Sequence, residues 1–215
     1  MLFCVGFDRL VVTICSKRQD DIMNFRYETP RLILRVLSDA DAPAVLAFLA
    51  QNRDLFERYE GEHVPQFYTR QFQEENLRQE YSLACKQMHI RFYVYLRENP
   101  DEIIGTVCFH NIQQVLYSSC EVGYKFAPAY HHRGYAAEAL EKGIDVMFSE
   151  LELHRIMAWV LPSNAPSVRL LTSLGFQFEG INRERAFLHG EWKDHAQYSL
   201  LSPLTHTHHS KGHNQ

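Results

Sequence analysis

The sequence has no excess of basic charge, and this limits the partners that it can hold. Its 22 lysines and arginines are outnumbered by 26 aspartates and glutamates, for a formal net charge of −4. Because proteins grip nucleic acids and anionic membranes mainly through clustered positive charge, we expect neither as a partner. The chain also lacks an apolar run long enough to cross a bilayer, so we expect no membrane insertion.

Cysteine pairs with metal-binding or redox spacing are also missing. The chain has five cysteines, Cys4, Cys15, Cys85, Cys108 and Cys120, and no Cys-x-x-Cys motif. An odd number without that spacing disfavours a disulfide framework and a structural zinc site, and it fits a reducing compartment. We therefore expect a cytoplasmic protein without a metal site, in which Cys108 and Cys120 are core thiols.

Regular patterning starts well inside the chain and stops before its end. We expect an N-terminal extension over 1–24 that is not part of the fold, with Met23 as an alternative start to Met1. Residues 25–201 form one predicted domain. The remaining 202–215 are polar and rich in histidine, and we expect a disordered tail because no fold surrounds those histidines to orient a metal.

Hydrophobic periodicity predicts a mixed α+β domain. Ser38-Asp39-Ala40-Asp41 is typical of a capping box at the start of the first helix. The residues 51–66 mix charges with aromatics and predict a loop or a short helix. The predicted elements are strand 31–36, a helix after Ser38, helix 70–88, strands 91–96, 103–110 and 119–126, helix 134–149, strand 155–160, helix 166–173, and closing strands 176–185 and 193–201.

The most informative stretch joins strand 119–126 to the helix that starts at Gly134. A helix N-terminus presents unpaired backbone N–H groups and the positive end of the helix dipole, which together can hold a phosphate. Gly134 and Ala136 leave room for its approach, and Arg133 adds positive charge. The stretch is neither a Walker A loop nor a Rossmann turn, because it lacks their lysine and glycine patterns.

This stretch resembles motif A of the GNAT superfamily of N-acetyltransferases, written Arg/Gln-x-x-Gly-x-Gly/Ala. Gly134 and Ala136 match the motif, whereas His131 stands in place of its first Arg or Gln. A second resemblance follows at the family's Asn-x-x-Ser and Leu-Gly-Phe stretch. It is carried by Asn164, Ser167 and Leu174-Gly175-Phe176, and the RimJ/RimL branch is resembled further by Glu28–Arg35, Asn52-Arg53, Glu179-Gly180 and Gly190–His195.

The resemblance covers nearly all of 27–201 and implies a fold and a co-substrate. The implied GNAT fold is a central mixed, mostly antiparallel twisted sheet flanked by helices. The implied co-substrate is acetyl-CoA, whose pantetheine amides pair with the strand before the loop. The residues implied to bind it are Tyr124, Phe126, His131, His132, Arg133, Gly134, Tyr135, Ala136 and Asn164.

Acetyl transfer to an amine needs a base for the amine and a proton for the departing thiolate. Glu121, on the strand beside the loop, is the first candidate base, with Glu184 as a second candidate. Many relatives place a tyrosine acid where this chain has Leu171, so Ser167 is the candidate proton donor. The sequence offers no cysteine with an evident histidine partner, and we expect the amine to attack the thioester directly.

The acceptor amine is left open by the sequence. The family precedent implies the N-terminal α-amine of a protein such as a ribosomal protein. Small amines, namely polyamines, aminoglycosides or amino acids, are alternatives because acceptor loops diverge while the cofactor site persists. A non-catalytic sensor of acyl-CoA also fits an intact cofactor loop. Both a monomer and a homodimer are compatible with the chain.

Overall fold

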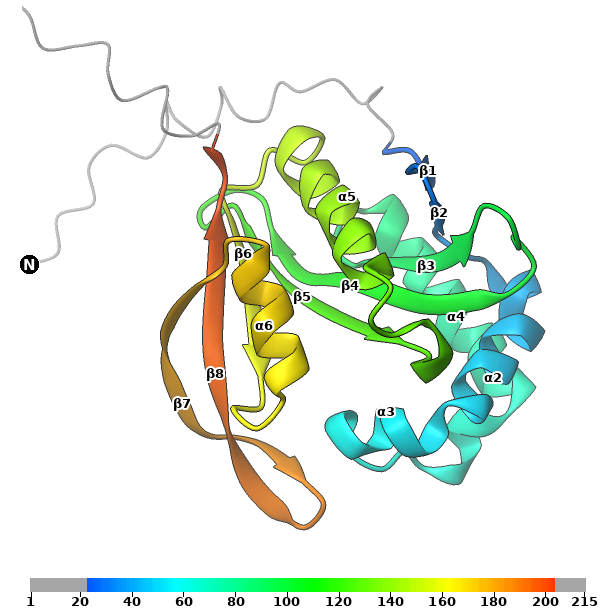
Figure 1. The fold of residues 1–215 in the computed structure, drawn as a ribbon. Helices are drawn as coiled ribbons and strands as arrows, with labels where there is room; N and C mark the ends of the chain where they lie inside the picture. Colours follow the sequence, from blue (N-terminus) through cyan, green and yellow to red (C-terminus); the bar gives the residue numbers. More distant parts are fainter. Residues whose placement is uncertain (1–22, 204–215) are drawn as a thin grey trace, which may run out of the picture.

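An eight-stranded sheet with helices on both faces organises residues 23–203, which are the residues described by the computed structural model (Figure 1). The strand order is β1-β2-β3-β4-β5-β6-β8-β7. The strands are β1 (Arg26–Glu28), β2 (Leu32–Arg35), β3 (Ile90–Leu96), β4 (Ile103–Gln113), β5 (Ser119–Phe126), β6 (Arg155–Val160), β7 (Gln177–Leu188) and β8 (Glu191–Leu201). Only β5 and β6 pair in parallel, so the predicted mixed, mostly antiparallel sheet is confirmed.

Five α-helices and three short 3-10 turns connect the described strands. The α-helices are α2 (Ala42–Gln51), α3 (Arg53–Glu60), α4 (Arg70–Cys85), α5 (Tyr135–Ser149) and α6 (Ala165–Ser173). The 3-10 turns are η1 (Asp39–Asp41), η2 (Pro65–Tyr68) and η3 (Pro128–Tyr130). The predicted capping box is present, since the Asp41 carboxylate accepts a 3.0 Å hydrogen bond from the Ser38 backbone N–H. It opens η1, which leads directly into α2.

The two faces of the sheet carry separate cores because side chains alternate along each strand. On one face, Val94, Val107 and Val122 pack with Leu140 and Met147 of α5. On the other face, aromatic and aliphatic side chains of β2 and β3 pack with α2, α3 and α4. This second core includes Ile33, Tyr93, Tyr95, Val45, Phe48, Phe56 and Leu77. The loop 127–134, which connects β5 to α5, is mostly exposed.

The expected terminal segments lie almost entirely outside the described residues. Met23 is 6% exposed and joins the main core, and Ser202 is 1% exposed. Packing in the described chain therefore reaches slightly beyond the expected domain 25–201 at both ends. Between residues 23 and 203, no helix is both long and apolar enough to span a membrane.

The outer strands of the sheet differ in length and regularity. β1 has three residues, whereas β7 has twelve. The pairing of β7 with β8 is interrupted between Phe178 and Gly180 and again between Asn182 and Ala186. Both irregularities are on β7, the strand that also carries the exposed residues Arg183, Glu184 and Arg185.

Helix α5 lies against the sheet without room for a side chain at Gly143. A Cβ atom at this position would lie 2.6 Å from Cε2 of Phe109, which is itself fully buried on β4. No real side chain tolerates such a distance, so either the ring or the helix would have to move. Gly143 therefore fixes how near α5 lies to the sheet, and with it the position of the N-terminus of α5.

We expect Gly143→Val to lower the free energy of unfolding by about 2 kcal/mol or more, because overpacking of the contact with Phe109 outweighs the modest gain in helix propensity over glycine. Urea unfolding followed by circular dichroism measures this. The matched control is Gly123→Val on β5, where an added Cβ meets no heavy atom within 4 Å. Equal stability of the two variants would contradict the packing account.

Candidate active site

The central feature of the site is the point where the neighbouring strands β5 and β6 stop pairing with each other. β5 pairs with β6 only from Ser119–Arg155 to Val122–Ala158, although both strands continue beyond that point (Figure 1). Past Val122, the register between the two strands ends. The backbone of β5 there faces no neighbouring strand on this side within the described chain, which is the arrangement that accepts an extended ligand as an added strand.

The turn between β5 and α5 ends at Gly134, which is the residue before the first turn of the helix. Its φ of 78° lies in the left-handed region, where a side chain would be strained. A Cβ there would also lie 3.3 Å from the guanidinium NH2 atom of Arg31. The turn residues His132, Arg133 and Gly134 are exposed. The geometry thus leaves the N-terminus of α5 exposed, and anion binding there stays a prediction.

His131 has a structural contact that the sequence did not predict. Its ring nitrogen Nε2 lies 2.8 Å from the backbone oxygen of Phe126. Since a carbonyl oxygen only accepts, Nε2 carries the hydrogen in this arrangement. The imidazole closes the loop onto the end of β5. The resemblance implies that His131 belongs to the acetyl-CoA-binding turn, and the structure gives its Nε2 a bond inside the protein.

Tyr124 and Ser167 meet at the gap between β5 and β6. The Tyr124 hydroxyl lies 2.6 Å from Ser167 Oγ, and it donates a longer bond of 3.3 Å to the Ser167 backbone oxygen. Burial raises the pKa of Tyr124 to about 12, and its bond with Ser167 opposes that rise only partly. The phenol therefore stays protonated at neutral pH. Asn164 caps α6, because its Oδ1 accepts the backbone N–H of Ser167 at 3.3 Å.

Glu121 lies on β5, three residues before Tyr124, so its side chain points to the opposite face of the sheet. Its carboxylate accepts a 3.1 Å bond from Asn111 Nδ2 and lies 3.4 Å from an Arg185 nitrogen. The Arg185 guanidinium stacks 3.5 Å above the ring of Trp159. The first candidate base is therefore an ion-paired carboxylate beside the gap.

Glu184, the second candidate base, has different surroundings. It is exposed on β7 with a φ of 51°. Its backbone N–H donates a 2.8 Å bond to Asp194 Oδ1.

A buried ionic cluster lies on the same face as Glu121 and was not foreseen from the sequence. Arg91 Nε bonds Glu80 at 2.8 Å, and His89 Nε2 lies 3.4 Å from Cys108 Sγ. Burial acts to raise the Glu80 pKa, but Arg91 and His89 outweigh it and lower it to about 2. Burial acts to lower the His89 pKa, but Cys108 and Glu80 raise it to about 9. Cys108 is 4% exposed, so this cysteine–histidine pair is part of the packed interior.

Lys125 lies near the end of β5, on the same face of the sheet as Glu121. Its ammonium bonds Glu60 of α3 at 2.8 Å and lies 5.0 Å from the centroid of the Phe56 ring. Burial lowers the Lys125 pKa, and Glu60 opposes this change. Helix α3 is thereby tied to the strand that carries Glu121.

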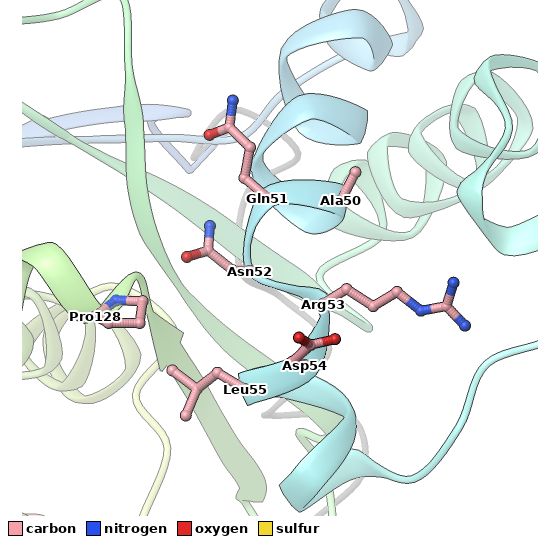
Figure 2. Close-up of a pocket in the computed structure, with 7 residues that line it drawn as sticks. All are labelled: Ala50, Gln51, Asn52, Arg53, Asp54, Leu55 and Pro128. Atoms are coloured by element: carbon pink, nitrogen blue, oxygen red, sulfur yellow. The ribbon is translucent and has the colours of Figure 1, made fainter.

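A shallow pocket of about 240 Å³ lies between the α2–α3 junction and Pro128 (Figure 2). Figure 2 shows Asn52 and Leu55 directed toward Pro128, whereas Arg53 points away. Its remaining lining residues are Ala50, Gln51 and Asp54. Neither Glu121 nor Ser167 lines it. The pocket therefore flanks the phosphate loop and is separate from the gap where acyl transfer is expected.

The separated strands, the open turn and α6 all fall inside one family match. The family model described as "Acetyltransferase (GNAT) domain" matches residues 31–177. The chain belongs to the GNAT acetyltransferases. It is an acetyl-CoA-dependent N-acetyltransferase, and the predicted co-substrate is confirmed. Among residues 23–203, no group of three His, Cys, Asp or Glu side chains is arranged to hold a metal ion.

Several relatives of this GNAT chain are similar over almost their full length. The Bacillus subtilis (strain 168) protein "Probable N-acetyltransferase YjcK" is 31% identical over 80% of this chain and 94% of its own. The Escherichia coli (strain K12) "[Ribosomal protein uS5]-alanine N-acetyltransferase" is 28% identical over 86% of this chain and 95% of its own.

Solved structures agree with these relatives. The Vibrio fischeri ribosomal-protein-S5-alanine acetyltransferase has a TM-score of 0.79 at 28% identity, covering 84% of this chain and 98% of its own. Mycobacterium smegmatis RimJ, in complex with CoA-disulfide, has a TM-score of 0.74 at 25% identity, covering 80% and 82%. The RimJ/RimL-like branch is therefore confirmed.

We expect Gly134→Val to weaken CoA binding about tenfold or more, because the new side chain forces a strained backbone and fills the approach to the helix N-terminus. His131→Ala should weaken it less, since the His131 side chain is used within the loop. Calorimetric titration of CoA compares the two variants. A larger loss in His131→Ala would mean that the imidazole, rather than the backbone turn, governs binding.

Proposed function

We propose that this GNAT enzyme acetylates the N-terminal α-amine of a protein, with a ribosomal protein as the first acceptor to test. The proposal is supported by two near-full-length relatives, the Escherichia coli and Vibrio fischeri enzymes, each named for the alanine of a ribosomal protein. A small amine is the competing acceptor. The third reading, a non-catalytic sensor, is set aside because the chain is an N-acetyltransferase.

The observation that carries the proposed chemistry is the placement of polar groups on opposite faces of one strand. Glu121 and Lys125 lie on one face, where Lys125 bonds Glu60 of α3 and Glu121 pairs with Arg185, whereas Tyr124 lies on the other face and contacts Ser167 of α6. An acyl donor lying along the gap beside β5 would thus have a carboxylate on one side and two hydroxyls on the other. This arrangement suits an amine that arrives from one face and a thiol that leaves toward the other.

The proposed step is direct attack of the neutral amine on the thioester carbonyl. A new N–C bond forms, the C–S bond breaks, and the amine proton passes to a base. The thiolate receives a proton from Ser167, whose hydroxyl lies 2.6 Å from the Tyr124 hydroxyl. Ser167 regains a proton from solvent, and the base releases the amine proton to solvent, before the next cycle. Positioned proton donors of this kind contribute by stabilising charge that develops only in the transition state.

Glu121 is the proposed base, acting directly or through one water. Its carboxylate lies beside the gap, 3.4 Å from an Arg185 nitrogen, and offers oxygen atoms that can accept a proton from the amine. Glu184 fits less well, because it is exposed on the hairpin and its backbone is held by Asp194. Cys108 is buried against His89 and offers no exposed nucleophile, which supports attack without a covalent enzyme intermediate.

An acceptor screen tests the proposed substrate class. We expect thiol release from acetyl-CoA to be fastest with peptides that carry the N-termini of ribosomal proteins, and slower with polyamines, aminoglycosides and free amino acids. The same peptides with acetylated N-termini are the control, since they differ only in the attacking amine. Faster turnover of any small amine than of all the peptides would assign the enzyme to small-molecule acetylation.

We expect Ser167→Ala to lower kcat by up to about 10²-fold while leaving the dissociation constant of acetyl-CoA nearly unchanged, because the donated proton matters as charge builds on sulfur. Ser173→Ala is the matched control, since Ser173 lies on the same helix and bonds only the Leu170 backbone oxygen at 2.8 Å. An unchanged kcat in Ser167→Ala, measured where chemistry limits turnover, would leave solvent as the proton source. Ping-pong kinetics would contradict direct attack.

A further inference from the structure

Arg31, at the start of β2, makes a dense set of contacts with the first turn of α5. Its Nε lies 2.6 Å from Glu138 Oε2, and its backbone N–H donates to Glu138 Oε1 at 2.9 Å. Its NH1 group donates a 2.9 Å bond to the backbone oxygen of Arg133. The guanidinium carbon lies 4.7 Å from the centroid of the Tyr135 ring. One side chain thus contacts the residues on both sides of Gly134.

These contacts cross a large distance in sequence. Arg31 and Glu138 are separated by 107 positions, and Thr29 adds a 2.5 Å bond from its hydroxyl to the same carboxylate. The turn between β1 and β2 is therefore bonded to the first turn of α5, which follows the loop 127–134. A planar guanidinium suits this task, because its fixed fork can bond a carboxylate and a carbonyl at the same time.

The negative charge of Glu138 is paired with the guanidinium of Arg31. It lies in the first turn of α5, close to where the phosphates of acetyl-CoA are expected. Burial acts to raise the Glu138 pKa, but hydrogen bonds from Thr29 and Arg31 outweigh it and hold that pKa below its usual value. The carboxylate is therefore ionised at neutral pH. Without a cation beside it, this charge would repel a bound phosphate.

We propose that Arg31 is a positioning residue of the acetyl-CoA site. It holds the Arg133–Tyr135 turn by the Arg133 carbonyl, and it neutralises Glu138 beside the pyrophosphate. In motif A of this chain, His131 replaces the usual Arg or Gln and turns inward to Phe126. Arg31 supplies a guanidinium to the same turn from the opposite end of the chain. This inference concerns CoA binding alone and is independent of the acceptor.

Calorimetric titration of CoA into the full-length protein tests this role without any acceptor or turnover. We expect Arg31→Ala to raise the dissociation constant of CoA about tenfold, the size expected for losing a charged hydrogen bond at a half-exposed site. Arg31→Lys should recover only part of the affinity, since an ammonium restores charge but not the fork. Arg31→Ala combined with Glu138→Gln should bind CoA more tightly than Arg31→Ala alone, because the unpaired carboxylate is gone.

The matched control is Arg97→Ala. Arg97, the residue after β3, is also an exposed arginine that contacts this turn, and its NH1 group donates to the Thr29 backbone oxygen at 3.3 Å. Its side-chain contacts are with β1 and its turn, so CoA affinity should stay within about twofold of the parent. An Arg31→Ala loss below twofold, or one matched by Arg97→Ala, would overturn the proposal. A double variant that binds no better than Arg31→Ala would overturn the neutralisation of Glu138.

Discussion

The parting of β5 and β6 beyond the Val122–Ala158 pair leaves polar backbone inside a sheet, and such backbone has to find partners. A sheet normally satisfies each interior strand from both sides. Here one side of β5 has no neighbouring strand within the described chain, and three helices lie around this unpaired edge. Helix α5 follows β5 after the loop 127–134, α6 places Ser167 against Tyr124, and α3 is bonded to Lys125 on the other face.

The two halves of the site are encoded very differently along the chain. The cofactor half lies within the continuous stretch from β5 to α6, as a strand–helix–strand unit followed by one more helix. The proposed acceptor half combines this stretch with α3, α4 and the β7–β8 hairpin. Under that proposal, exchanges on α3 or the hairpin would change the acceptor while leaving the turn before α5 intact, which is how one fold serves many substrates.

Much of the fold follows from local patterns. Strands 119–126 and 155–160 were predicted with the bounds that the structure shows, because apolar residues fill their core-facing positions. Helix α3 was foreseen only as a loop or short helix. Phe56 is its sole buried residue, so it has no apolar stripe to reveal it. The strands β7 and β8 are longer than predicted, because their ends pair with each other in a hairpin that projects beyond the core.

The site residues, like the elements of the fold, were predictable only where they depend on a continuous stretch of sequence. The turn at Gly134 was predicted, because the residues that form it are continuous in the sequence. The inward bond of His131, the Arg31–Glu138 contact and the Cys108–His89 pair were not, because each depends on which side chains meet once distant strands align. Periodicity shows which face a residue occupies. It does not show which residue from another element lies opposite it.

The outer strands have a consequence for how the molecule meets other polypeptides. Open strand edges invite unwanted pairing between molecules, and proteins commonly guard against it with short edge strands, bulges and charge. β1 offers only three residues, while β7 is bulged twice and carries Arg183, Glu184 and Arg185. Both margins of the sheet are thus poor templates for self-association. Within the described sheet, the unpaired edge of β5 beyond Val122 is therefore the better template for an extended molecule.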